Sequence, residues 1–153
     1  MIYTVTFNPA LDYVMKVEKL QFDDINRTYG EELNYGGKGI NVSVILSRLG
    51  VENTALGFQA GFTGEKLEEL LKADGIKTDF IALKNGMTRI NVKIKAQTEL
   101  DINAVGPPIE EDEVERLFEK IKEFQSGDVI VLAGSVPGTL PPDIYCLLYT
   151  SDA

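Results

Sequence analysis

The chain of 153 residues contains no histidine and no tryptophan, and Cys146 is its single cysteine. Without histidine, the usual zinc sites and the hydrolytic triads built on a histidine base are excluded. A single cysteine cannot form an internal disulfide, and no ligand cluster surrounds Cys146 in the sequence. These absences remove several common chemistries before any motif is considered.

Basic residues are also scarce, because 15 Lys and Arg stand against 24 Asp and Glu for a net charge of −9. Such a chain is a poor partner for nucleic acid or for an anionic membrane surface. Any anionic ligand must therefore be met by a local cluster of cations. The apolar runs are too short to span a bilayer, and the opening residues lack the features of a signal peptide, so we expect a cytoplasmic protein.

Hydrophobic residues make up 44% of the sequence and charged residues 25%, which is ordinary for one globular domain with a sizeable core. Segments rich in β-branched residues alternate with apolar patterns of helical period. We expect strands over residues 1–7, 11–17, 54–58, 88–95 and 129–132, and helices over residues 38–49, 63–74 and 110–124. This alternation predicts an α/β layered domain with a parallel central sheet.

The sequence also predicts where the helices begin and end and how the strands are buried. Gly50 is expected to stop the first helix at its C′ position, and Thr63 is expected to be the N-cap of the second. The apolar run 129–132 predicts a parallel strand that is buried on both faces. Segments 11–17 and 88–95 alternate in polarity, so we expect them to form an antiparallel appendage with one face left for a ligand.

The most informative stretch is residues 36–43, with the sequence Gly-Gly-Lys-Gly-Ile-Asn-Val-Ser. Glycine-rich backbone in front of a helix predicts an anion site, because the first helical turn offers unpaired N–H groups and the positive end of the dipole. A Walker A loop is excluded, since Glu32 and Gly39 stand where it requires a glycine and a hydroxyl residue. A dinucleotide fingerprint is excluded by Val42. The stretch therefore indicates a cradle for a sugar or a phosphate.

Further polar residues are predicted to reach the same rim of the sheet, where parallel strands present their carboxyl ends. Amides and a carboxylate suit sugar hydroxyls, and an Arg fork suits a phosphate. The candidates are Asp12, Lys38, Asn41, Arg89, Asn91 and Ser135. Taken singly, each has an ordinary structural interpretation, and Lys93 is left as a solvated strand residue. Together they favour a sugar phosphate as the ligand.

With these residues in view, the chain resembles the phosphofructokinase B branch of the ribokinase family of carbohydrate kinases. Residues 4–12 resemble the first strand and substrate aspartate of that branch, and residues 36–50 match its amino-terminal signature. Residues 88–91 resemble a lid strand that holds the substrate phosphate, and residues 134–137 resemble a loop whose serine touches the sugar. The likeness covers residues 1–145, with lid segments over about 11–36 and 86–105.

The resemblance implies phosphoryl transfer from ATP, with Mg²⁺, to a ketohexose phosphate. Fructose 1-phosphate, giving fructose 1,6-bisphosphate, is the expected substrate, and tagatose 6-phosphate is the alternative. The lids of two subunits are expected to permit a homodimer. The substrate-binding residues that the resemblance and the local chemistry together predict are Asp12, Arg27, Gly36, Gly37, Lys38, Asn41, Arg89, Asn91 and Ser135.

The sequence also departs from the family pattern. Ala60 stands where relatives carry a glycine, which matters little if its φ is negative and more if it is positive, and Ala104 also replaces a common glycine. The glycine-rich motif that carries the catalytic base in the family's carboxy-terminal half is absent, so the fragment alone is expected to be inactive. Residues 146–153 resemble translated adapter sequence, with a genuine helix begun at residues 141–143 as the alternative.

Two other functions remain open from the sequence. A sugar-phosphate binding module that never had a catalytic half belongs to another class, and it predicts a natural stop soon after Ala153. A ribokinase or nucleoside kinase is the second option, but an uncharged sugar would leave Lys38 and Arg89 without an anion.

Overall fold

The structure, a computed structural model, describes residues 1–150. Its first sheet contains four parallel strands in the order β5-β4-β1-β8. The bounds of these strands are Ile2–Thr6 for β1, Asn53–Gln59 for β4, Thr78–Ala82 for β5 and Val129–Leu132 for β8. The parallel central sheet predicted from the sequence is therefore confirmed.

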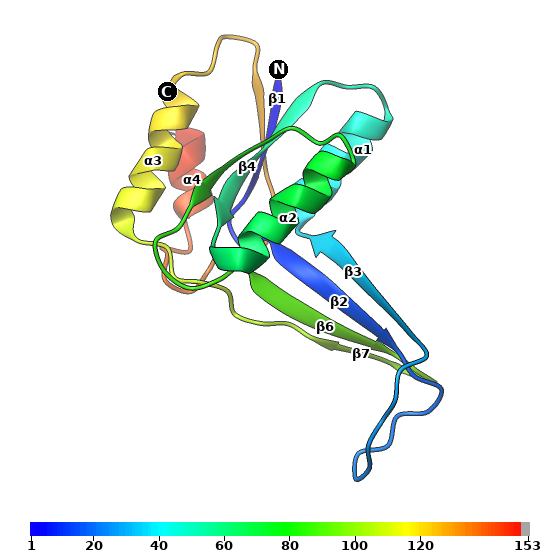
Figure 1. Cartoon of the computed structure of the whole chain (residues 1–153). Coiled ribbons are helices and arrows are strands. Elements are labelled where there is room, and N and C mark those ends of the chain that lie inside the picture. Colours follow the sequence, from blue (N-terminus) through cyan, green and yellow to red (C-terminus); the bar gives the residue numbers. More distant parts are fainter. Residues whose placement is uncertain (151–153) are drawn as a thin grey trace.

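Helices cover both faces of this sheet, with α1 and α2 on one side and α3 and α4 on the other (Figure 1). Their bounds are Lys38–Arg48 for α1, Gly61–Ala73 for α2, Glu111–Lys122 for α3 and Ile144–Thr150 for α4. Each side has its own apolar cluster, the larger beneath α3 and α4 around Phe7, Phe58 and Leu117. The result is the three-layer α/β arrangement that the alternating elements predict.

A second sheet has the strand order β3-β2-β6-β7. Its strands are Ala10–Lys16 for β2, Gly30–Gly36 for β3, Arg89–Lys95 for β6 and Glu99–Ile102 for β7. The sheet is mixed rather than purely antiparallel, because β2 and β6 pair in parallel. The reason is topological: β2 follows β1 and β6 follows β5, so both strands leave the same carboxyl rim in the same direction.

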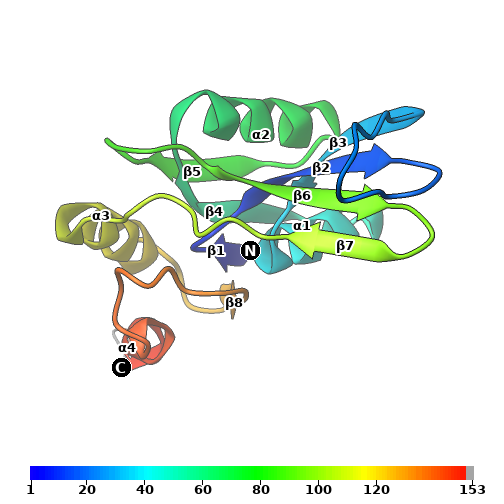
Figure 2. The ribbon, with the colours of Figure 1, turned by 90° about the horizontal axis from the view of Figure 1, so that it is seen from below.

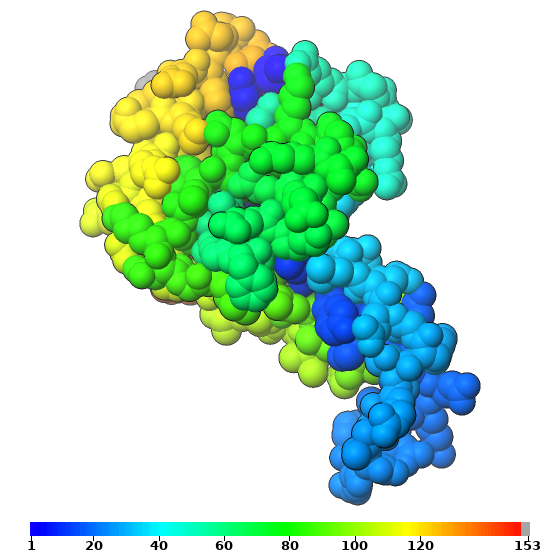
Figure 3. All heavy atoms as spheres, in the orientation of Figure 1, coloured from blue at the N-terminus to red at the C-terminus, as the bar shows by residue number. Residues whose placement is uncertain are grey.

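The second sheet projects from the layered body as an arm, and Figures 2 and 3 show this from two directions. The loop of residues 17–29 forms the far tip of the arm. The strands that leave the body bring their first residues to the rim where β1 ends and α1 begins. Residues at this base of the arm are the ones that can meet the glycine-rich stretch.

The polar alternation of β2 and β6 is confirmed by their register. Asp12 lies opposite Asn91, and Val14 lies opposite Lys93, so these residues share one face of the second sheet. Leu11 lies opposite Ile90 on the other face, which is turned toward α2. One face is thus polar and the other apolar, as the period of two predicts.

Two detailed predictions are wrong. Helix α2 begins at Gly61 with Ala60 as its N-cap, and the hydroxyl of Thr63 instead donates to the Thr88 carbonyl. Strand β8 is not buried on both faces, since Val129 is 50% exposed. Within the described residues β8 pairs with β1 alone and forms an edge of the sheet, so one side of the strand lacks cover.

Other local predictions hold. Gly50 follows the C-cap Leu49 with φ +73°, the left-handed conformation that a C′ glycine supplies. Ala60 has φ −146°, so the methyl group that departs from the family pattern costs no backbone strain. Helix α4 corresponds to the alternative for the last residues, a helix begun at residues 141–143, although it starts at Ile144; Ile144 and Leu148 are buried against α3 and its neighbours. Whether residues 146–153 are translated adapter sequence stays a prediction. Residues 151–153 of the suspected tail lie outside the described part of the chain.

Candidate functional site

Asp12 stands at the centre of the polar face of the second sheet. Asn91 donates a hydrogen bond from Nδ2 to Asp12 Oδ1 at 3.0 Å, and Asn91 Oδ1 accepts the Ala104 N–H at 3.2 Å. Asn91 is 7% exposed, so its amide is fixed between these two partners. Asn91 therefore orients the Asp12 carboxylate and the chain after β7, while Asp12 keeps its second oxygen for other donors.

Gly36 closes the other side of the Asp12 carboxylate. A Cβ atom built on Gly36 would lie 2.9 Å from both carboxylate oxygens of Asp12. No side chain fits at that distance unless Asp12 moves. Gly36 is thus required by the close approach of β3 to Asp12, which explains the first glycine of the stretch 36–43.

Arg89 begins β6, at the base of the arm. Its guanidinium donates from one Nη to the Asn8 carbonyl at 3.0 Å and from the other to the Ala104 carbonyl at 3.2 Å. Burial lowers the pKa of Arg89 below its ordinary value, and the nearby Asp12 carboxylate opposes that shift. Arg89 Nε is buried and has no hydrogen-bond partner within residues 1–150. A half-buried cation with unused donor capacity is suited to an anionic ligand.

The amino terminus of α1 lies next to this group. Its N-cap Gly37 has φ +129° and no side chain, so side-chain capping of the first turn is absent there. A Cβ on Gly37 would lie 2.9 Å from Thr6 Cγ2, and one on Gly39 would lie 2.4 Å from Thr6 Oγ1. Glycine thus lets the helix start press against the end of β1 while its first N–H groups stay available to an anion.

Lys38 and Asn41 belong to the first turn of α1, and both side chains are exposed. The loop after β8 reaches the same helix start, because a Cβ on Gly134 would lie 3.8 Å from Lys38 Cβ. Ser135, the next residue, is exposed at this place. The fold therefore brings three separate segments, 8–12, 36–41 and 134–135, to one rim.

Arg27 is the exception among the predicted residues. It is exposed in the loop 17–29 at the far tip of the arm, away from the start of α1 (Figure 1). Within this chain Arg27 is not gathered with Asp12 and Arg89. Lys93 lies on the polar face, but it is paired with Asp101 at 3.0 Å, and that hydrogen bond raises the pKa of Lys93.

Two polar residues at the site, Asn34 and Asn8, are not among the candidates named from the sequence, although residues 8–12 were expected at this rim. Asn34 on β3 lies directly opposite Asp12, and its side chain is exposed on the polar face. Asn8 is 7% exposed, supplies the carbonyl that holds Arg89, and donates from Nδ2 to the Val105 carbonyl at 2.8 Å. Asn34 reaches the site because β3 pairs with β2, and Asn8 reaches it because its loop contacts Arg89 and Val105. Neither contact leaves a periodic pattern in the sequence.

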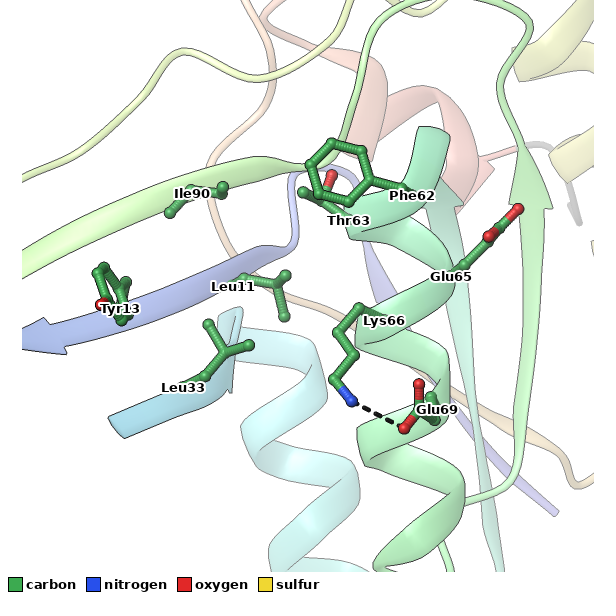
Figure 4. Close-up of a pocket in the computed structure, with 9 residues that line it drawn as sticks. All are labelled: Leu11, Tyr13, Leu33, Phe62, Thr63, Glu65, Lys66, Glu69 and Ile90. Carbon is green, nitrogen blue, oxygen red and sulfur yellow. Dashed lines mark hydrogen bonds and ion pairs between the residues drawn. The ribbon is translucent and has the colours of Figure 1, made fainter. Parts of the chain in front are cut away.

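The apolar face of the second sheet borders a pocket of about 480 Å³ against α2 (Figure 4). Figure 4 shows Leu11, Tyr13, Leu33 and Ile90 facing Phe62 and the charged residues of α2. This pocket lies on the opposite side of the sheet from Asp12 and Asn91. Its apolar lining suits packing better than recognition of a sugar phosphate.

No group of three or more Asp, Glu, Cys or His side chains within residues 1–150 is arranged to hold a metal ion. None of the helices described has both the length and the apolar character needed to span a membrane.

The rim combines a carboxylate, several amides, a helix start and two cations, Lys38 and Arg89. This set binds hydroxyls and an anion side by side.

Comparison with known proteins fits this set of groups. The family model described as pfkB family carbohydrate kinase matches residues 5–152, so the chain belongs to that family of kinases.

Among curated relatives, a 1-phosphofructokinase from Bacillus subtilis is 46% identical over 145 residues, covering 95% of this chain and 48% of the relative. A D-tagatose-1-phosphate kinase from Bacillus licheniformis is 41% identical, covering 97% and 48%. A crystal structure from Staphylococcus aureus, described as a phosphofructokinase, superposes with a TM-score of 0.91 at 45% identity, covering 97% of this chain and 48% of that one. The chain spans about half the length of these relatives.

Proposed function

We propose that this chain is the acceptor-binding half of a kinase that transfers the γ-phosphoryl group of ATP to fructose 1-phosphate, giving fructose 1,6-bisphosphate. The transfer forms a bond from a sugar hydroxyl oxygen to the γ-phosphorus and breaks the bond to the leaving ADP oxygen. The observation that carries the proposal is the meeting of Arg89, Asp12 and the start of α1 at one rim. The similarity to a 1-phosphofructokinase supports the choice of substrate.

Each predicted residue except Arg27 has a role at the rim in this proposal. Asp12 and Asn41 orient the sugar hydroxyls, and Ser135 touches the sugar from the loop after β8. Gly36 and Gly37 let the backbone approach the ligand. Arg89 and Lys38 neutralise the phosphate that the substrate already carries. Asn91 contributes through the Asp12 carboxylate that its amide holds, since that amide is already paired.

ATP and Mg²⁺ belong to the proposed reaction, and no group of three or more possible metal ligands is found within residues 1–150. Bound ATP supplies the phosphoryl group. The residues of this chain bind and orient the acceptor, which is a large part of phosphoryl-transfer catalysis. We place the catalytic base in the portion that the longer relatives have and this chain lacks, so the chain alone is expected to be inactive.

A coupled assay that follows ADP release tests the proposal. The full-length protein should convert fructose 1-phosphate to the bisphosphate in the presence of ATP and Mg²⁺, and the 153-residue chain should release no ADP above background. Turnover by the purified 153-residue chain would contradict the placement of the catalytic base outside this chain. Saturable binding of fructose 1-phosphate without turnover by the full-length protein would favour a non-catalytic binding module.

Tagatose phosphates are the alternative substrates, and the similarity to a D-tagatose-1-phosphate kinase supports them. Fructose 1-phosphate and tagatose 1-phosphate differ in the configuration of one hydroxyl, and tagatose 6-phosphate differs further in the position of its phosphate. The ratio of kcat/KM for fructose 1-phosphate to that for tagatose 1-phosphate and tagatose 6-phosphate separates the candidates. Free fructose or adenosine as the preferred acceptor would instead indicate ribokinase or nucleoside kinase chemistry.

A homodimer formed through the arms is part of the proposal. The tip loop exposes three large apolar side chains, with Phe22, Ile25 and Tyr29 at 88%, 78% and 69% exposure. Apolar surface of this kind, next to the open apolar face of the sheet, favours burial against a second copy. Arg27 on the same loop then reaches a substrate only across such an interface. Sedimentation of the full-length protein, with Phe22→Ser as the disrupting variant, tests the dimer.

A further inference from the structure

A buried junction joins the base of the arm to the layered body at Thr88, the residue before β6. The Thr88 N–H donates to the Ala60 carbonyl at 2.9 Å, and the Thr88 hydroxyl accepts the Ala60 N–H at 2.9 Å. The Thr88 carbonyl accepts the hydroxyl of Thr63 at 2.7 Å. The amide, hydroxyl and carbonyl of Thr88 are thus all engaged by residues at the start of α2.

The junction is dry, because Ala60, Thr63 and Thr88 are at most 1% exposed. Hydrogen bonds without access to water are costly to break, since each freed group stays unpaired. The contact is also tight: Gly61 has φ +59°, and a Cβ there would lie 3.1 Å from the Gly86 carbonyl oxygen. The start of α2 therefore holds segment 86–88 firmly.

The Thr63 hydroxyl bonds more closely to another segment than to its own helix. Its hydroxyl lies 3.4 Å from the Ala60 carbonyl within its own helix, but 2.7 Å from the Thr88 carbonyl on another segment. The shorter bond is the one between elements. Figure 4 shows Thr63 on the first turn of α2, beside the strand that carries Ile90. Thr63 is therefore not the N-cap of α2, and its side chain instead forms a hydrogen bond that links the helix to the base of the arm.

The hydrogen bond from Thr63 affects Arg89 because the Thr88 carbonyl and the Arg89 N–H belong to one planar peptide group. When the carbonyl is held in place, the orientation of that peptide plane is fixed, and with it the direction in which the Arg89 side chain leaves the backbone. The guanidinium donates to the carbonyls of Asn8 and Ala104 at 3.0 and 3.2 Å, while Nε is buried without a partner in residues 1–150. The direction of Arg89 thus depends on its backbone as well as on these two hydrogen bonds.

We infer that Thr63 is a positioning residue for phosphate recognition, acting through the Thr88 carbonyl to aim Arg89 at the phosphate of the sugar. This inference rests on the proposed function, in which Arg89 meets that phosphate. Removing the Thr63 hydroxyl frees the Thr88–Arg89 peptide and weakens binding of the phosphorylated sugar. Binding of an unphosphorylated sugar does not depend on the hydrogen bond from Thr63 to the Thr88 carbonyl.

The test is a calorimetric titration of the full-length protein with fructose 1-phosphate. Thr63→Val keeps the shape of the side chain but removes the donor, and it should raise the Kd about tenfold. Thr63→Ser keeps the hydroxyl and should restore the Kd to within about twofold of the wild type. Thr4→Val is the matched control, because it removes another buried hydroxyl contact, to Ser43 Oγ at 2.7 Å, which joins β1 to α1 and does not involve segment 86–88.

A double-mutant cycle separates positioning from general damage. If Thr63 acts through Arg89, then adding Thr63→Val to an Arg89→Gln protein should change the Kd by less than about twofold. An equal loss in both backgrounds would overturn the inference, and so would an equal loss in the Thr4→Val control. Should Thr63→Val fail to fold, Thr63→Ala removes the same donor without placing a methyl group beside the carbonyl, and the same outcomes apply.

Failure of the inference and failure of the proposed function give different results. A wild-type protein that takes up no fructose 1-phosphate contradicts the proposed function. A wild-type protein whose binding weakens with Arg89→Gln but not with Thr63→Val contradicts the positioning role alone.

Discussion

The two sheets of this molecule differ in how much of each strand they bury. Strand β4 of the parallel sheet buries all of its residues except Thr54, whereas every residue of β7 in the second sheet is exposed. Helices cover the parallel sheet on both faces, whereas the second sheet has α2 beside its apolar face and the start of α1 beside the Asp12 end of its polar face. The parallel sheet therefore holds most of the buried core, while the second sheet brings Asp12, Asn91 and Arg89 to the rim of the body, and the two sheets are joined at points such as Thr88.

The largest expected effect is on stability, from the parallel sheet. Phe58 is 1% exposed in the larger apolar cluster, and Phe58→Ala should lower the free energy of unfolding by about 3–5 kcal/mol. Ile102→Ala, at a position on β7 that is 55% exposed, should change it by less than about 0.5 kcal/mol. Urea denaturation of the chain measures both. Equal losses would break the contrast between the sheets.

The next effect is on binding, from the second sheet. Arg89→Gln removes the charge that we assign to the phosphate and should cost about 2 kcal/mol of binding free energy, or roughly 30-fold in Kd. Lys93→Gln removes a cation from the same face that is already paired with Asp101, and it should alter the Kd by less than about twofold. Calorimetry with fructose 1-phosphate compares the two variants. A larger loss for Lys93→Gln would contradict the assignment.

A glycine pair on β3 sharpens the same contrast within one strand. Gly36→Ala forces its methyl group against the Asp12 carboxylate at 2.9 Å, and we expect a loss of about 1–2 kcal/mol in binding free energy. Gly30→Ala, at the other end of the strand, meets only Lys16 Cδ at 3.4 Å and should leave binding unchanged. The two Kd values decide whether Asp12 must keep its present position.

The smallest expected effect comes from a link between the arm and the body. Tyr35 on β3 donates its hydroxyl to Asp74 at the C-cap of α2, at 2.7 Å, and Tyr35→Phe should cost about 1 kcal/mol of unfolding free energy.

The same link gives a pH dependence. Burial, and after it the hydrogen bond to Asp74, raises the pKa of Tyr35 above its ordinary value of 10.0. The fold therefore favours the neutral phenol, so this contribution is present below pH 10 and is lost as the pH rises through the raised pKa. Thermal melts between about pH 8 and 11 should show that loss in the wild type and not in Tyr35→Phe. A parallel decline in both proteins would exclude the link.

Local chemistry was enough to predict much of the fold. Strict alternation in β6 gave the correct faces for Asn91 and Ile90, and Gly50 marked the end of α1. These features depend on neighbouring residues, so a single sequence contains them. Strand β3 was missed because its residues, largely Gly, Glu and Asn, show no apolar period. Its pairing with β2 determines that it is a strand.

Contacts between distant residues were not predictable. Thr63 fits an N-cap by its local sequence, but its hydroxyl finds a carbonyl 25 residues away. The bond from Asn91 to Asp12 spans 79 residues, and the one from Arg89 to Asn8 spans 81. The candidate residues were therefore identified one by one, whereas the network that orients them required the fold.

In the proposed function, the rim recognises the phosphate of a sugar phosphate as well as the sugar. The most direct measurement is a pair of calorimetric titrations of the full-length protein, one with fructose 1-phosphate and one with fructose. We expect saturable binding of the phosphorylated sugar, tighter than that of fructose by about a hundredfold, since a charge-assisted phosphate contact is worth a few kcal/mol. Equal affinity for the two sugars, or no uptake of fructose 1-phosphate, would contradict it.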